Sequence, residues 1–403
     1  MAEFQYQGVD KQGKKVTGTL EAASEGDLRM LLRNMGVRPQ KISKSGVLNS
    51  DLKSLVGVGK SVKLEVLVSF TRQLQVLVSS GIPLVQALDI LSEQTNSSVM
   101  KRTVTVIKEK VSAGSYFWEA ISGYPKIFPK IFIALMRAGE ASGAMDQMLK
   151  RLTRYLEDAD RLRKLVKSAM LYPIIVVLIG IGVISLMLVF VIPKFEELLK
   201  SSGQALPGPT QFVITISHFF ANNVLYIFGG VGIFIFLLTR YLKTSEGRAI
   251  KDRLVFQLPI FGNLSQKAGV ARFSRTMQTL LSAGVTLIDA IDICKSTIDN
   301  AVLETAVAKI RGDVEAGKTL GAVIAKLGVF PPMAVQMISV GESTGALDKM
   351  LDKVADFYES EVETMVNGLT KLIEPLILVF LGGTVGGLMI AMYLPIFKLA
   401  GSA

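Results

Sequence analysis

The sequence has few of the residues that most enzyme active sites use. It contains one histidine, His218, and one cysteine, Cys294. A single cysteine excludes a disulfide within the chain, and a single histidine leaves no metal site or catalytic triad that depends on histidines. The N-terminal residues lack the basic and apolar stretches of a signal peptide, so we expect none. These absences favour a structural or binding function without a cofactor.

Aromatic residues are also scarce, at 7% of the chain, although hydrophobic residues make up 50%. The apolar content is therefore mostly aliphatic and lies in long runs, which is typical of membrane helices rather than of a large soluble core. The net charge of +11 suits nucleic acid or an anionic membrane surface. Lysine and arginine crowd the flanks of the apolar runs, which favours a membrane topology signal and predicts no nucleic-acid partner.

One helical module followed by a membrane span occurs twice in the chain. The segment Gly139–Asp146 returns as Gly341–Asp348, and residues 70–91 return as 273–294, with Cys294 in the place of Leu91. That correspondence indicates a small buried apolar role for the cysteine. Each copy continues into a proline, a long apolar run and a second proline. These span-boundary prolines are Pro173, Pro193, Pro375 and Pro395. The duplication predicts two equivalent lobes, each tied to the membrane by its own helix.

Three apolar runs are predicted to cross the membrane. Residues 171–192 carry no charge. In 372–394, Glu374 stands just before the apolar run 376–394, and two asparagines interrupt the start of 219–239. Basic residues crowd the chain before the first span and after the second, which predicts cytoplasmic modules, a cytoplasmic N-terminus and a periplasmic C-terminus. The two duplicated spans then run in parallel, unlike the inverted repeats common in secondary transporters.

A small separate unit precedes the duplication. Alternating residues around Phe4 and Tyr6 predict a β-hairpin, followed by a helix and a returning strand. We therefore predict a mainly all-α integral membrane protein with two duplicated cytoplasmic helical-bundle modules, three transmembrane helices and a small N-terminal α+β unit. The expected order is the N-terminal unit (1–45), a linker (46–62), the first module (63–170), span one (171–192), a periplasmic loop (193–218), span two (219–239), a cytoplasmic connection (240–263), the second module (264–371), span three (372–394) and a periplasmic tail (395–403).

Residues Gly312–Thr319 match the pattern of a phosphate-binding P-loop. A working P-loop needs a buried strand before it and a helix N-terminus that cradles phosphate. The preceding residues 301–311 instead have the periodicity of an amphipathic helix, and the first module lacks the lysine. We interpret the match as a helix that ends at Gly317 and restarts.

The repeated Gly-Glu segments offer the best candidate site. Two carboxylates in each, Glu140 with Asp146 and Glu342 with Asp348, suit a hard cation but fall short of the six to eight oxygens that calcium takes. We favour helix–turn–helix corners in which the carboxylates lie at the positive N-terminus of the next helix and glycines permit the turn. The corner residues are Gly139, Glu140, Gly143, Gly341, Glu342 and Gly345.

Small residues crowd the last span. Gly382, Gly383, Gly386 and Gly387 form two overlapping Gly-x-x-x-Gly patterns. Such faces let membrane helices approach closely, either for self-association, for a client helix, or for packing within one subunit. No span carries an ionisable residue near its centre, which disfavours a pump or coupled carrier.

The chain resembles the inner-membrane platform proteins of type IV pilus assembly, a family shared with the F protein of type II secretion systems. The resemblance covers nearly the whole chain. The residues that carry it are Ser80-Gly81-Ile82-Pro83-Leu84, Arg137-Ala138-Gly139-Glu140, Leu171-Tyr172-Pro173, Leu206-Pro207-Gly208-Pro209-Thr210, Phe273-Ser274-Arg275-Thr276, Val340-Gly341-Glu342 and Tyr393-Leu394-Pro395-Ile396-Phe397.

The resemblance implies a scaffold of the inner membrane and not an enzyme. It implies a homodimer that contacts a cytoplasmic hexameric assembly ATPase, a retraction ATPase, pilins or pseudopilins, other inner-membrane accessory proteins and membrane lipid. Movement of the motor would lift pilins from the membrane into a growing filament, the fimbrium. The alternatives are the equivalent platform for protein secretion by a type II system, a channel or transporter, and, through the P-loop match, an ATPase.

Overall fold

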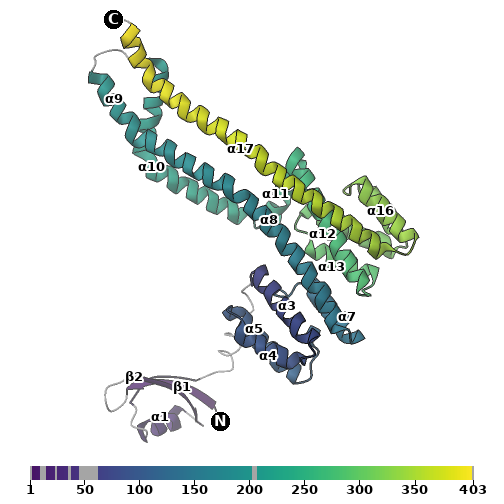
Figure 1. The fold of residues 1–403 in the computed structure, drawn as a ribbon. Helices are drawn as coiled ribbons and strands as arrows, with labels where there is room; N and C mark the ends of the chain where they lie inside the picture. The colour runs from purple at the N-terminus through teal and green to yellow at the C-terminus, as the bar shows by residue number, and fades with distance from the viewer. Residues whose placement is uncertain are drawn as a thin grey trace. The chain divides into compact units, whose positions relative to one another are not determined.

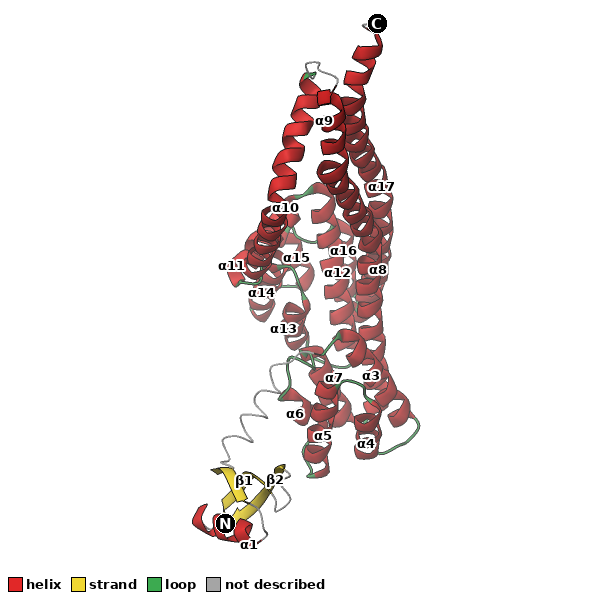
Figure 2. Cartoon of the chain, turned by 90° about the vertical axis from the view of Figure 1, so that its left-hand side faces the viewer, coloured by secondary structure: helices red, strands yellow, loops and turns green. Residues whose placement is uncertain are grey.

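A computed structural model describes residues 2–9, 15–22, 25–34, 38–44, 62–201 and 207–401 of the chain. It divides into two compact units, the first formed by Met1–Leu67 and Pro83–Pro129 and the second by Val68–Ile82 and Lys130–Ala403. The linker expected over 46–62 lies outside the described residues except for its last position. Helices dominate both units (Figures 1 and 2), as the sequence predicts.

The N-terminal residues form a sheet and one helix. Strands β1 (Ala2–Val9), β2 (Lys15–Ala22) and β3 (Arg38–Lys44) pair antiparallel in the order β2-β1-β3, and α1 (Glu25–Asn34) lies between the last two in sequence. Phe4 faces Leu20 across one ladder, and the register of the other shifts between Gln7 and Gly8. The turn expected between β1 and β2 lies outside the described residues.

The remainder of the first unit is a small bundle. It contains α4 (Leu84–Gln94), α5 (Ser98–Ser112) and α6 (Phe117–Ser122). Ser97 caps α5 by accepting a hydrogen bond from the Met100 N–H, which satisfies one of the free donors of the first turn. The helices close over fully buried side chains that include Leu88, Ile107 and Phe117. Helix α3 (Leu64–Ser79) crosses the division between the two units.

The second unit contains the membrane helices and the second helical module. Its elements are α7 (Lys130–Ser142), α8 (Met145–Leu186), the π-helical segment η1 (Met187–Val191), α9 (Ile192–Ser201), α10 (Gly208–Tyr241), α11 (Ser245–Gln257), α12 (Pro259–Ser282), α13 (Leu287–Thr297), α14 (Ala301–Glu315), α15 (Leu320–Leu327), α16 (Pro332–Ser343) and α17 (Leu347–Gly401).

Three of these helices are long and apolar enough to cross a membrane, which agrees with the three predicted spans. They are the helix Met145–Leu198, α10 and Leu347–Phe397, and in the most apolar stretch of each at most 11% of residues are buried within the chain. Such exposed aliphatic and aromatic surface requires lipid or another membrane helix around it. Helix α17 packs against α8, whereas α10 packs against η1, α9 and α17 (Figure 1).

Helix α10 begins earlier than the sequence analysis predicted. Residues 193–218 were expected to form a loop, but α9 and the first turns of α10 occupy most of the described part of this segment. Pro207 stands at the N-cap of α10 and Pro209 in its first turn. Proline is well tolerated there because the first N–H groups of a helix have no intrahelical acceptor. The two prolines therefore start the helix where a loop was expected.

Helices α8 and α17 are the duplicated long helices. Each runs from its helical module into its apolar stretch, with Pro173 inside α8 and Pro375 and Pro395 inside α17. In the second module, α17 packs against α12, α16 and α8. Phe273 of α12 meets Phe330 edge to face at 5.2 Å between ring centroids, at the centre of that module's core. The module and its membrane helix therefore form one packed body.

Candidate functional site: the repeated corners and the proline ends of the membrane helices

The Gly-Glu corner of the second module joins α16 to α17. Gly345 has a φ of +69°, a left-handed conformation that favours glycine, and Gly143 has the same value in the first copy. A Cβ on Gly341 would lie 2.8 Å from Met350 Cβ and 3.0 Å from Leu347 Cα, so only glycine lets α16 approach α17 this closely. The two glycines of each motif thus have different physical functions, one in the turn and one in the packing.

Glu342 caps a helix with both of its carboxylate oxygens. Its Oε1 accepts a hydrogen bond from the Leu320 N–H at 2.7 Å, and its Oε2 accepts one from the Gly321 N–H at 2.9 Å. These N–H groups begin α15, whose N-cap residue Thr319 makes no side-chain capping bond. The carboxylate therefore satisfies two free donors and lies at the positive end of the helix dipole.

This finding corrects one detail of the predicted corner. The carboxylates were expected at the N-terminus of the next helix, and this holds for Asp146 and Asp348 in the first turns of α8 and α17. Glu342 instead binds α15, the preceding helix. Glu140 lies half-buried at the equivalent place near the end of α7. Among the described residues, no three His, Cys, Asp or Glu side chains gather closely enough to hold a metal ion.

The P-loop-like segment has the predicted helix-ending geometry. Gly312 lies inside α14, the helix ends at Glu315, and Gly317 follows with a φ of +84°. The Lys318 ammonium lies 2.6 Å from the Asp313 carboxylate. The N-terminus of α15, where a P-loop would bind phosphate, already holds the Glu342 carboxylate. The prediction of a helix that ends and restarts is confirmed.

An ionic cluster fixes α12 to α17. The Arg275 guanidinium donates to both oxygens of Glu359 at 2.9 Å, to Asp352 at 2.6 Å and to Asp356 at 2.5 Å. Burial alone would lower the pKa of the guanidinium, but the hydrogen bonds to Glu359 and Asp356 outweigh this effect and raise it. The sequence analysis did not identify this cluster as a site.

The first copy preserves the central pair of this cluster. Arg72 and Glu157, which align with Arg275 and Glu359 in the duplication, form an ion pair of 2.6 Å between α3 and α8. Contacts also join the copies, because the Tyr155 hydroxyl of α8 lies 3.2 Å from the Thr276 hydroxyl of α12. The recurrence of Phe-x-Arg at 70–72 and 273–275, with a glutamate at the matching place on each long helix, was the available sequence signal.

At the ends of the membrane helices that lie far from the helical modules, α10 satisfies backbone groups that prolines leave free. Pro193 follows the π-helical segment η1, where the Ile192 N–H donates to the carbonyl five residues earlier. Proline has no N–H, so the next carbonyl in that pattern, Leu188 O, loses its donor. The Ser217 hydroxyl of α10 donates to this carbonyl.

The second copy contains an equivalent hydrogen bond to a carbonyl that a proline leaves without a donor. Pro395 lies inside α17 and cannot donate to Ala391 O, four residues earlier. The Thr210 hydroxyl of α10 donates to that carbonyl at 2.5 Å. An apolar cluster surrounds both contacts, formed by Leu188, Ile192, Val213, Ala391 and Met392. His218 of α10 meets the buried carboxylate of Glu196 at 2.5 Å in the same region.

The glycine faces of the last span are open within the chain. A Cβ on Gly382, Gly383, Gly386 or Gly387 would meet nothing within 4 Å, and the same is true of Gly229, Gly230 and Gly232 on α10. The close contact between the duplicated spans lies elsewhere, at Gly180, where a Cβ would fall 2.3 Å from the Leu381 side chain. The tandem glycines therefore do not serve packing between the described helices of one subunit.

Comparison with known protein families assigns the chain to one of them. Residues 70–193 and 273–395 each match the family described as type II secretion system (T2SS), protein F, and residues 1–43 match its N-terminal domain. The chain belongs to the type II secretion system protein F family. The two matches coincide with the predicted duplication, and they end at Pro193 and Pro395. The family consists of membrane platform proteins and not of known enzymes, and with the three apolar helices it indicates an inner-membrane protein.

Similar proteins of this family come from several bacteria. The type IV pilus assembly protein PilC of Myxococcus xanthus is 41% identical over 401 residues, covering 100% of this chain and 96% of its own. PilC of Thermus thermophilus is 39% identical over 404 residues, covering 100% and 99%. The type II secretion system protein F of Vibrio cholerae is 28% identical over 400 residues, covering 99% and 98%.

Proposed function

We propose that this protein is the inner-membrane platform of a type IV pilus assembly machine, which couples a cytoplasmic assembly ATPase to the extraction of pilins from the membrane. The observation that carries the proposal is the similarity, over 91–100% of the chain, to pilus assembly proteins at 32–41% identity, four of them at 39–41%, against 28–31% for type II secretion F proteins. The type II secretion platform is the second candidate.

The long helices supply a physical route for the coupling. At 1.5 Å per residue, α8 spans about 60 Å and α17 about 80 Å, so each reaches from its helical module through the hydrocarbon core. The Arg275 cluster and the Arg72–Glu157 pair hold a neighbouring helix onto each of them. A turn or tilt imposed on a module would therefore move the membrane helix with it.

The proposed topology follows from the basic residues beside the spans. Arg161, Lys164 and Lys167 precede the first span, and Arg240 and Lys243 follow the second. The positive-inside rule supports modules at 63–170 and 264–371 in the cytoplasm, within reach of the motor, and a periplasmic C-terminus. The open glycine faces on α10 and α17 suit the membrane helices of pilins or of a second subunit.

Deletion and complementation in the source organism would test the proposal. We expect the deletion strain to lack pili by electron microscopy while pilins accumulate in the membrane, and to keep normal secretion of exoproteins. Restored piliation with the wild-type gene completes the test. Normal piliation with lost exoprotein secretion would support the type II platform instead.

One variant tests whether the protein itself uses nucleotide. We propose that it has no ATPase activity, because the Glu342 carboxylate occupies the helix N-terminus that follows the P-loop-like segment. Lys318→Ala should complement piliation as fully as the wild type. ATP hydrolysis by the purified protein that disappears in Lys318→Ala would contradict this proposal.

A further inference from the structure

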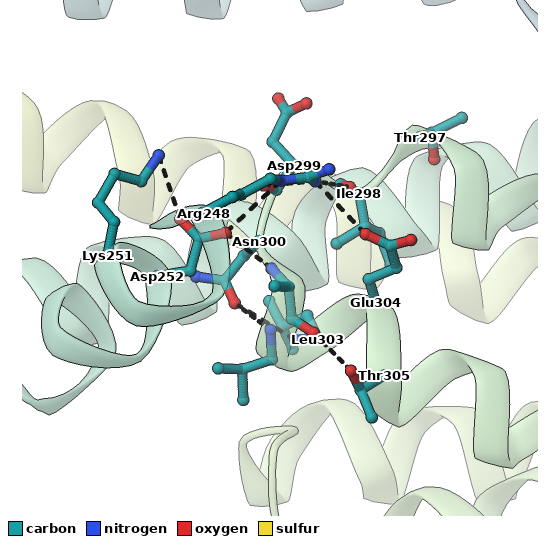
Figure 3. A network of polar contacts seen from close by, with 12 residues as sticks. Arg248, Lys251, Asp252, Thr297, Ile298, Asp299, Asn300, Leu303, Glu304 and Thr305 are labelled. Carbon is teal, nitrogen blue, oxygen red and sulfur yellow. Dashed lines mark hydrogen bonds and ion pairs between the residues drawn. The ribbon is translucent and has the colours of Figure 1, made fainter. Parts of the chain in front are cut away.

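The orientation of α11 is set by its polar side. This helix follows α10 directly after the second span, and Figure 3 shows its polar side chains against the start of α14. The buried Asp252 carboxylate accepts a hydrogen bond from the Ala301 N–H at 2.9 Å. The Arg248 guanidinium donates to the carbonyl of Asp299 at 3.0 Å and lies 3.4 Å from the Glu304 carboxylate. These contacts fix which face of α11 points away from the protein.

The exposed side of α11 combines apolar and basic side chains. Ile250 is 49% exposed, Leu254 is 59% exposed, and Leu258 at the corner with α12 is 50% exposed. Lys251 and Arg253 are exposed on the same helix. A surface helix of a soluble domain usually buries its large apolar side chains. Because α11 begins four residues after the last residue of α10, its exposed apolar and basic groups suit a membrane surface.

A groove of about 770 Å³ lies between α11 and α14. Ile250, Leu254, Val302 and Ala306 contribute to its apolar lining. Two basic side chains, Arg253 and Lys309, also line it, and no acidic residue does. Neither basic group forms an ion pair within the described part of the chain. The groove therefore combines an apolar channel with uncompensated positive charge.

We propose that the groove between α11 and α14 binds an anionic phospholipid of the cytoplasmic leaflet, with an acyl chain along Ile250 and Leu254 and the phosphate at Arg253 and Lys309. The continuity of α11 with the second span brings the groove to the level of the headgroups. Two basic groups beside an apolar channel match the phosphate and the chain of a lipid. This site is independent of the role in pilus assembly, and it would hold the second module against the membrane surface.

Fluorescence quenching by brominated lipids tests the site in the full-length protein. The single tryptophan is replaced by Trp118→Phe, and Leu254→Trp places a probe in the groove. The protein is placed in nanodiscs of phosphatidylcholine and phosphatidylglycerol, with one lipid brominated at a time. We expect stronger quenching by brominated phosphatidylglycerol. Ile288→Trp, on the half-exposed face of α13, is the matched probe outside the groove and should show no such quenching.

Charge variants then test the phosphate contacts. Lys309→Gln should reduce the preference for phosphatidylglycerol roughly fivefold, since a basic residue near an anionic surface contributes about that factor. Lys295→Gln makes the same change on α13 outside the groove and should leave the preference unaltered. Ile250→Trp repeats the test from a second position if Leu254→Trp does not fold, as judged by circular dichroism and gel filtration.

Two results would overturn the proposal. Quenching of Leu254→Trp and Ile250→Trp no greater than that of Ile288→Trp would mean that lipid does not enter the groove. Equal lipid preference in Lys309→Gln and Lys295→Gln would mean that the groove has no site for the phosphate.

Discussion

Replacement of Glu342 by glutamine tests the function of the repeated corner. The variant Glu342→Gln keeps the size of the side chain but removes the charge, and its single amide oxygen can accept from only one of the two N–H groups that the carboxylate now binds. Hydrogen bonds to charged groups contribute about 1.5–3 kcal/mol each. The retained bond offsets part of this loss, so we expect the free energy of local opening at α15 to fall by about 1.5–2 kcal/mol.

Hydrogen exchange measured by mass spectrometry reports this opening directly. Because about 1.4 kcal/mol corresponds to a tenfold change, peptides that cover Leu320–Leu327 should exchange roughly 10- to 30-fold faster in the variant. Peptides from the first unit should exchange as in the wild type. The measurement uses the full-length protein in detergent, so the membrane helices remain in place.

Asp348→Asn is the matched control at the same corner. Its carboxylate lies in the first turn of α17, where the helix dipole alone contributes about 0.3–1 kcal/mol. We therefore expect at most a roughly fivefold change, confined to the start of α17. Unchanged exchange at α15 in Glu342→Gln, or equal effects of the two variants there, would refute the assignment of Glu342 as the cap of α15.

Three further predictions concern the spans and the buried thiol. Thr210→Val should lower the free energy of unfolding by about 1–3 kcal/mol, because it leaves a carbonyl of α17 without a donor. The control Thr215→Val loses only a hydrogen bond within its own helix and should change the free energy of unfolding little. Thermal unfolding in detergent measures both variants. Gly180→Leu should prevent the close packing of α8 on α17 and lower the yield of folded protein in gel filtration, while Gly182→Leu, with nothing within 4 Å, should be tolerated. Burial raises the pKa of the Cys294 thiol, so maleimide should label this thiol only after unfolding. The unfolded thiol ionises from about pH 8.5, so the contribution of the buried thiol to stability should decline as the pH rises above that value. Cys294→Ala should remove this decline.

The architecture of the chain was predictable because it depends on patterns within each segment. The duplication, the helical modules and the three spans follow from repeats and apolar runs, which do not require knowledge of neighbouring helices. The start of α10 was missed because two prolines near Gly208 resemble a loop, although proline also fits the first turn of a helix. The order of the segments was therefore clearer than their exact ends.

The contacts of the site were less predictable because they depend on which helices meet. Glu342 was recognised as a corner residue, but its partner was assigned to α17, since the antiparallel arrangement of α15 and α16 is not visible in the sequence. Arg275 recurs as Arg72 in the duplication, but its acidic partners become apparent only when α12 lies beside α17. Gly180 shares its span with Gly182 and forms no Gly-x-x-x-Gly pattern, whereas the tandem glycines of α17 form two such patterns and have nothing within 4 Å of a Cβ.

The unduplicated helix α10 gains a clear physical role from the prolines of the two copies. Duplication gave both long helices a proline near the end of the span far from the module, and each proline frees one carbonyl in a region with little water to satisfy it. Ser217 and Thr210 lie two turns apart on α10 and donate to one of these carbonyls each. A single helix therefore joins these ends of both copies. If the modules move during function, α8 and α17 must pivot about this junction, because separating them there would expose two unpaired carbonyls at once.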